Sequence, residues 1–270
     1  MNQTQARQAE VESPVPITAN FSLFTWLLIA LFVISSVMLA ITVVLAAIKA
    51  VSPSTVPASS SGALLYASRF DSYPQEWLPN EGADYSKITD NSLHIFLNTV
   101  QNGIYSTLVY DFGDFDARMN VTRLAAADDY SEAGMLFRFH DKFNYLMFKI
   151  RGDGYYRIER RKDGQLDVLS EWHASTAVLP GLNAVNQLRV VGQGNTFKFF
   201  VNGEPLVLCP NGPQKQKSTW NGDKCMSNNQ QTSASLKDDS FSAGKIGAGA
   251  AAESGAGIEV AFSDVLVYQP

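Results

Sequence analysis

The sequence predicts an all-β antiparallel sandwich that is preceded by a single transmembrane helix. The first observation is an uncharged apolar run over residues 21–48, FSLFTWLLIALFVISSVMLAITVVLAAI. The second is a series of short apolar runs from residue 63 onward, separated by turn-forming residues at near-regular intervals, which is the pattern of antiparallel strands joined by turns. No long helical period competes with that pattern after residue 63.

The N-terminal part begins with a polar, proline-containing stretch over residues 1–20, which predicts a short tail without a core. Residues 21–49 form the predicted transmembrane helix, because a helix rising about 1.5 Å per residue over this length spans a hydrocarbon core of about 30 Å. A cleaved signal peptide is the alternative, but signal sequences have apolar regions of about 7–15 residues. The length favours a retained anchor that contacts membrane lipid through residues 21–48.

A spacer follows the predicted helix. Residues 50–62, AVSPSTVPASSSG, are rich in proline, serine and alanine. Such a composition favours an extended, solvated chain without a core. The spacer therefore separates the anchor from the predicted domain, residues 63–270.

The predicted domain consists of short strands joined by tight turns. Turn residues such as Asp163-Gly164, Gly194-Asn195 and Asn202-Gly203 supply the positive φ that hairpin turns demand. The candidate strands are residues 64–70, 92–98, 105–110, 117–126, 133–139, 145–151, 155–161, 166–171, 187–191, 196–201, 245–249 and 257–268.

Two of these strands carry informative patterns. In residues 196–201, TFKFFV, alternation places Phe197 and Phe199 on one face and Lys198 on the other. In residues 145–151, YLMFKIR, both faces are apolar. We expect the latter strand to be central in its sheet and covered on both sides.

The two cysteines indicate the compartment of the domain. Cys209 and Cys225 lie in one polar loop, CPNGPQKQKSTWNGDKC, at a spacing that fits a local disulfide. Two free thiols or half of a metal site are the alternatives, although no C-x-x-C motif or nearby histidine supports zinc. A disulfide places the domain outside the cytoplasm, so we expect a single-pass plasma-membrane protein with a cytoplasmic N-terminus.

The charge balance excludes one class of partner. The chain has a formal net charge of −5, and the part outside the predicted tail and anchor carries the same charge. Nucleic acids and anionic headgroups are bound by basic patches. We therefore expect no nucleic-acid partner.

The sequence also resembles a known superfamily. The motifs are GMLFRFHDKFNYLMFKIRGDGYYRIERRKDG from Gly134, NQLRVVGQGNTFKFFVNGEPL from Asn186, GKIGAGA from Gly244 and VAFSDVLVY from Val260. Together they resemble the concanavalin A-like lectin and glucanase superfamily, in particular laminin-G-like modules and the domains named 3-keto-disaccharide hydrolases. The resemblance covers residues 62–270 and implies a jelly-roll β-sandwich. That superfamily includes lectins, glycosidases and adhesion modules, so the resemblance implies the fold more than the function.

Catalytic patterns of that superfamily are missing from the sequence. Its retaining glucanases carry a Glu-x-Asp-x-x-Glu strand motif that brings two carboxylates to one face, and this chain has no such spacing. The histidines, His94, His140 and His173, stand apart from any nucleophile motif. We expect the scattered carboxylates to be solvated and the domain not to be an enzyme, with a glycoside hydrolase as the alternative. These carboxylates are Asp128, Asp129, Glu132, Glu159, Asp163 and Glu171.

A structural calcium ion is a further alternative, although no cofactor is required by any motif. Asp71 follows the first predicted strand and Asp264 lies in the last one. Carboxylates are hard oxygen ligands that suit calcium. Asp71 fits a turn-forming role equally well.

Exposed aromatic side chains are the candidate ligand contacts, because a flat ring stacks on the C–H face of a sugar while polar groups bind its hydroxyls. Trp220 lies beside Asn221 and Asp223 in the cysteine-bounded loop, and either contacts a ligand or folds back onto the sandwich as a staple. Trp172, Tyr155 and Tyr156 complete the candidate set, with core or edge packing as the alternative for Trp172 and Tyr155.

Two functions of different class follow from these observations. The first is a membrane-anchored module that binds a glycan or another envelope component. The second is an accessory or structural subunit whose helix packs within a larger membrane complex. Copurification with other membrane subunits distinguishes the second from the first.

Overall fold

The computed structural model describes residue 32 and residues 62–70, 75–213 and 216–270. The chain divides into two units, residues 1–56 and residues 57–270, and the second is described here. The predicted anchor, apart from Phe32, and the candidate calcium ligand Asp71 lie outside the described residues. Within the described ranges, no helix has the length and apolar character needed to cross a bilayer.

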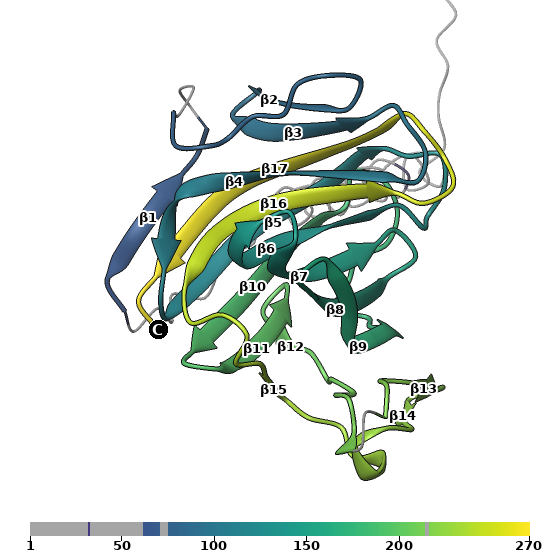
Figure 1. Ribbon diagram of the computed structural model, residues 1–270. Coiled ribbons are helices and arrows are strands. Elements are labelled where there is room, and N and C mark those ends of the chain that lie inside the picture. The colour runs from purple at the N-terminus through teal and green to yellow at the C-terminus, as the bar shows by residue number, and fades with distance from the viewer. Residues whose placement is uncertain (1–31, 33–61, 71–74, 214–215) are drawn as a thin grey trace, which may run out of the picture. The chain divides into compact units, whose positions relative to one another are not determined.

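Two antiparallel sheets stack to form the domain (Figure 1). The nine-stranded sheet has the order β12-β11-β10-β5-β17-β3-β2, with β1 paired to β17 and β15 paired to β11. The six-stranded sheet has the order β4-β16-β6-β7-β8-β9. The first sheet contains β1 (Leu64–Ser68), β2 (Tyr85–Thr89), β3 (Ser92–Leu97), β5 (Phe115–Ala125), β10 (Val185–Gln193), β11 (Thr196–Val201), β12 (Glu204–Pro205), β15 (Leu236–Lys237) and β17 (Ile258–Tyr268). The second contains β4 (Asn102–Phe112), β6 (Glu132–Asp141), β7 (Asn144–Arg151), β8 (Tyr155–Lys162), β9 (Gln165–Ala174) and β16 (Gly244–Ala252).

Each predicted strand overlaps an observed one, and the predicted turns have the expected backbone. Asp163 and Gly164 have φ of 51° and 78°, and Asn202 and Gly203 have φ of 52° and 87°. Two consecutive positive values match the twist of a two-residue hairpin. The prediction missed β2 and the two-residue strands, because segments such as YSKIT in β2 have little apolar alternation.

The core lies between the two sheets and follows the alternation of each strand. Phe197 and Phe199 point into it from β11, as predicted, while Lys198 is exposed. The ring of Phe137 on β6 lies 5.2 Å from that of Phe197 and 5.9 Å from that of Phe199. These contacts join the two sheets across the sandwich.

Strand β7 is central in its sheet, as predicted, and Leu146, Phe148 and Ile150 point into the core. Its opposite face is also largely shielded from solvent, as expected, since Tyr145 and Met147 are 9% and 7% exposed. These two side chains pack into a separate small cluster that lines a cleft.

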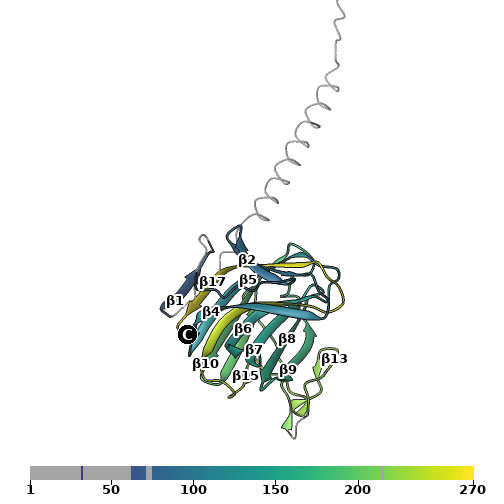
Figure 2. The same cartoon turned by 45° about the horizontal axis from the view of Figure 1, so that its top comes forward.

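The cysteine-bounded loop forms an appendage beside the edge strand β9. Cys209 and Cys225 are joined in a disulfide, which confirms the predicted bridge, and both residues are buried. Between them the chain forms the hairpin of β13 (Trp220–Asn221) and β14 (Lys224–Cys225), followed by the 3-10 turn η2 (Asn228–Gln230). The hairpin lies beyond β9 in both views (Figure 2).

Candidate functional site

A cleft of about 720 Å³ opens on the outer face of the six-stranded sheet, the face turned away from the core. This volume lies within the range of small-molecule sites. Tyr105 and Tyr145 line it, and their rings lie 6.2 Å apart. Burial raises the pKa of both phenols, so both hydroxyls stay protonated at neutral pH and can donate hydrogen bonds.

Small residues on β16 form part of the lining between these aromatic side chains. Gly249 and Ala251 face the cleft, while Ala248 and Ala250 belong to the core on the other face. A Cβ atom at Gly249 would lie 2.8 Å from Leu136 Cδ1. Because glycine has no Cβ, the side chain of Leu136 can pack against the backbone at this position, beneath the cleft.

A buried ion network borders the cleft. Lys149 Nζ on β7 lies 2.6 Å from Glu132 Oε2 on β6 and 2.8 Å from Glu159 Oε1 on β8. The three side chains are 12%, 4% and 3% exposed. Burial alone would lower the pKa of Lys149, but the carboxylates of Glu159 and Glu132 outweigh that effect and raise it. Lys149 is therefore charged at neutral pH.

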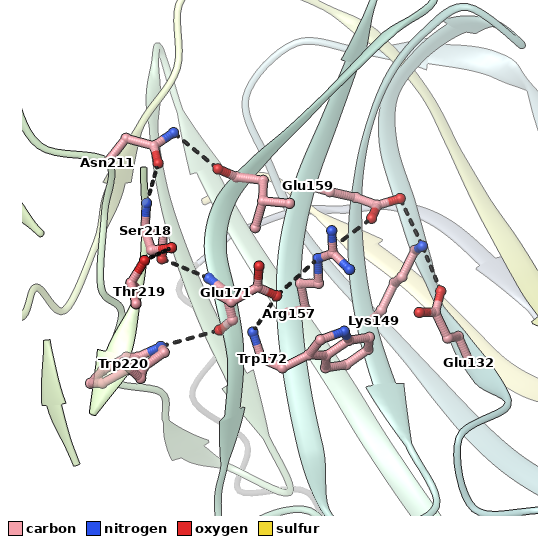
Figure 3. A network of polar contacts seen from close by, with 11 residues as sticks. Glu132, Lys149, Arg157, Glu159, Glu171, Trp172, Asn211, Ser218, Thr219 and Trp220 are labelled. Atoms are coloured by element: carbon pink, nitrogen blue, oxygen red, sulfur yellow. Dashed lines mark hydrogen bonds and ion pairs between the residues drawn. The ribbon is translucent and has the colours of Figure 1, made fainter. Parts of the chain in front are cut away.

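The network continues toward β9 (Figure 3). Arg157 Nε lies 3.9 Å from Glu159 Oε2 and 3.5 Å from Glu171 Oε1. The first distance is too long for a hydrogen bond, and Glu159 Oε2 has no hydrogen-bond partner among the described residues. This oxygen is itself buried and is not exposed to a ligand in the cleft.

The sequence interpretation missed this network. It treated Glu132 and Glu159 as solvated, which is wrong because both are almost fully buried. The side chain of Glu171 is 39% exposed, which is closer to the predicted solvated state. The available signal was Lys149, which shares one face with Tyr145 and Met147 in the predicted strand over residues 145–151. Such a lysine requires a partner when the face is buried.

A second cluster, which we name the aromatic platform, surrounds Arg151 at the end of β7. The guanidinium lies 4.5 Å from the ring centroid of Trp172, 4.9 Å from that of Tyr155 and 5.2 Å from that of Tyr130. Asp153 accepts hydrogen bonds from Arg151 Nε and Nη2 at 3.1 and 2.7 Å. These contacts fix the cation among the rings.

An irregularity in β9 turns Trp172 toward this platform. The pairing of β8 with β9 shifts between Tyr156 and Ile158, so Glu171 and Trp172 together lie opposite Arg157. Both residues contact that arginine, Glu171 through its carboxylate and Trp172 through its ring at 5.6 Å. Bulges commonly redirect side chains in this way.

The structure places Trp220 apart from the aromatic platform. Its ring stacks on His173 with centroids 3.8 Å apart and planes 10° apart, and its Nε1 donates a hydrogen bond to Glu171 O at 3.2 Å. Trp220 therefore folds back onto β9 of the sandwich, which is the staple alternative of the sequence analysis. Asp223 lies 3.9 Å from His173 Nε2 with a fully exposed side chain. Burial lowers the pKa of His173 and Asp223 opposes that shift, while Asn221 is exposed at the hairpin turn.

The remaining candidates lie elsewhere. Tyr156 is 1% exposed in the core and its hydroxyl donates a hydrogen bond to Val207 O, so its ring is not accessible to a surface ligand. Asp264 is exposed in β17 and accepts a hydrogen bond from Asn120 Nδ2 at 2.8 Å. The described residues contain no cluster of three or more His, Cys, Asp or Glu side chains suited to a metal ion.

The arrangement suits binding of a polar ligand with apolar faces. Aromatic rings offer stacking surfaces, and the tyrosine hydroxyls can donate hydrogen bonds. The carboxylates of Glu132 and Glu159 both contact the ammonium group of Lys149.

No protein-family model matches the chain, and no curated protein sequence is significantly similar to it. Solved structures do match in fold. A Bacillus subtilis protein of unknown function with a galectin-like fold has a TM-score of 0.53 and 14% identity, over 78% of this chain and 97% of that one. The carbohydrate-binding module CBM66 from Bacillus subtilis has a TM-score of 0.50 and 13% identity, over 72% of this chain and 95% of that one.

A β-glucanase from Bacillus licheniformis also matches, with a TM-score of 0.50 and 11% identity, over 78% of this chain and all of that one. At these identities the likeness concerns the fold alone, and folds host many functions. The described domain therefore has the jelly-roll-like β-sandwich fold that is also found in carbohydrate-binding and glucanase structures.

Proposed function

We propose that the domain is a non-catalytic glycan-binding module and that the cleft on its six-stranded sheet is the binding site. The observation that carries the proposal is the combination of aromatic lining and a buried polar border in one cleft. A pyranose offers C–H faces that stack on Tyr105 or Tyr145 and hydroxyls that accept hydrogen bonds from the tyrosine hydroxyls of the cleft. The fold shared with a carbohydrate-binding module supports this choice.

Binding without hydrolysis is favoured by the position of Lys149. Glycoside hydrolysis requires one protonated carboxylic acid and a second carboxylate that acts as nucleophile or base. Here Glu132 and Glu159 both contact the ammonium group of Lys149, so these two carboxyl groups are engaged in ion pairs within the protein and are almost fully buried. The hydrolase alternative is kept as an outcome of the test, because the fold also occurs in a glucanase.

The test measures binding and turnover with the same full chain in mild detergent. An array of neutral oligosaccharides identifies the ligand class, and Tyr145→Ala should abolish the binding that it reveals. Tyr110→Ala is the matched control, since Tyr110 is an exposed tyrosine of β4 outside the cleft lining. Turnover of a β-glucan that disappears in Glu159→Gln would contradict the non-catalytic proposal.

The proposed module is displayed on the outer side of the plasma membrane by residues 21–49. The buried disulfide supports an oxidising compartment, where such bridges persist. Protease added to intact cells should release the domain by cutting within residues 50–62. Protection of the domain would overturn this orientation, and stoichiometric copurification with other membrane subunits would favour an accessory role.

A further inference from the structure

The cleft and the aromatic platform lie on the same face of the same strands. On β7, Leu146, Phe148 and Ile150 point into the core, so Tyr145, Lys149 and Arg151 share the outer face. Tyr145 pairs with Arg161 at one end of β8, and Ile150 pairs with Tyr156 near the other end. The cleft tyrosine and Arg151 therefore mark opposite ends of one strand pair.

The separation of these two aromatic sites follows from the strand register. Tyr145 and Arg151 are six residues apart on β7, and a strand rises about 3.3 Å per residue, which gives about 20 Å. This distance exceeds the size of a single sugar ring. One ligand can contact both sites only if it is a chain of several rings.

The platform offers a preformed surface for such a chain. Tyr130 is 55% exposed and Trp172 is half-buried. Arg151 contacts both rings and is itself held by Asp153. A surface whose rotamers are already fixed loses little conformational entropy when a ligand binds.

The charges between the two sites are already paired within the protein. Lys149 contacts Glu132 and Glu159, Arg151 contacts Asp153, and Arg157 contacts Glu171. Because each of these three cations has a carboxylate partner, the stretch between the two sites has no spare cation for an acidic group. Arg161 and Lys142, which line the cleft at the Tyr145 end, have no ion pair among the described residues.

We infer that the ligand is a linear oligosaccharide, uncharged in the rings between the two sites, that lies along β7 and β8 from the cleft to the aromatic platform. This inference rests on the proposed glycan-binding function and adds the length and charge of the ligand. Trp172 forms the distal contact and Tyr145 the proximal one. Lys149 lies between Tyr145 and Arg151 on β7, and Figure 3 shows its ion network beside Trp172.

The experiment is calorimetry on the full chain with cello-, laminari-, xylo- and manno-oligosaccharides of two and six rings. For the series that binds, the hexasaccharide should bind about tenfold or more tightly than the disaccharide, because a second contact adds avidity. Trp172→Ala should remove this length advantage and leave disaccharide affinity unchanged. Trp172→Phe should retain most of the advantage, and Tyr110→Ala should change neither affinity.

The outcomes separate this inference from the proposed function. Binding whose affinity does not rise with length, or a length advantage that survives Trp172→Ala, overturns the inference and leaves glycan binding intact. Tighter binding of oligogalacturonides than of neutral chains also overturns it. Failure of every series to bind contradicts the proposed function, and the inference falls with it. Unchanged circular dichroism and melting temperature establish that Trp172→Ala is folded.

Discussion

The two faces of strand β7 are both largely shielded from solvent, yet they are chemically unlike. Toward the core, Leu146 and Phe148 are fully buried among apolar side chains. On the outer face, Tyr145 and Met147 are 9% and 7% exposed, and Lys149 is held between two carboxylates. The same strand therefore contributes one face to the sandwich and the other to the cleft.

The difference shows how one sheet can serve stability and binding at once. The inner face is stabilised by removal of apolar surface from water, which needs no directional contacts. The outer face keeps charges buried only because each has a partner at short distance. A second substitution that removes the unpaired charges should therefore restore stability lost on the outer face. Stability lost on the inner face should have no such repair.

Phe148→Ala should have the largest effect, because it leaves a cavity among the rings between the sheets. Phe148 is fully buried and its ring centroid lies 5.4 Å from that of Phe199. We expect a loss of about 3–5 kcal/mol in the free energy of unfolding, measured by urea denaturation. A loss no larger than that of the exposed control Leu166→Ala would contradict the role assigned to this face.

Loss of the disulfide should rank second and should spare both faces of β7. Cys209→Ala with Cys225→Ala removes a bridge across 16 residues of sequence, and closure of such a loop stabilises by about 3 kcal/mol. The core strands lie outside the loop, so the sandwich should stay folded at room temperature. Thermal unfolding with and without reductant measures the effect, and wild-type protein that unfolds on reduction would contradict it.

Lys149→Met should come next, because it leaves Glu132 and Glu159 buried without their cation. Fully buried pairs lose about 3–5 kcal/mol in this way, and the partial exposure of Lys149 reduces our expectation to about 2–3 kcal/mol. The triple variant Glu132→Gln, Lys149→Met, Glu159→Gln should recover most of the loss. Phe148→Ala has no such repair, so failure of the triple variant would remove the distinction between the faces.

The comparison of wild-type protein with Lys149→Met also predicts how the free energy of unfolding depends on pH. The pKa of Lys149 is raised above its usual value of 10.5 in the folded state. Its contribution to stability is therefore complete below the unfolded pKa and is lost as the pH rises through the folded pKa. Above about pH 10.5, wild-type protein should therefore lose more stability with rising pH than Lys149→Met, whereas equal losses would argue against the ion network.

Trp220→Ala should have the smallest effect, because it removes one ring stack and one hydrogen bond at the edge of β9. Such contacts contribute about 1–2 kcal/mol together. Oligosaccharide affinity should stay unchanged, because Trp220 stacks on His173 and does not line the cleft. Abolished binding with an unchanged melting temperature would instead make Trp220 the ligand contact.

Local patterns in the sequence were enough to predict the longer strands apart from β2, the hairpin turns and the disulfide. Alternation placed Phe197 and Phe199 inside, and Asp163-Gly164 marked a turn with two positive φ values. These features depend on residues that are neighbours in the chain, so a linear pattern records them. The retained anchor, the absence of catalysis and the calcium alternative stay predictions.

Only the tertiary structure decided which polar residues meet. Glu132, Lys149 and Glu159 come from three adjacent strands, and no sequence spacing links them. An irregularity in β9 gave Trp172 its contact with Arg157, and the stack on His173 made Trp220 a staple. Each depends on strand register, because a shift of one residue in the pairing would send these side chains to the opposite face.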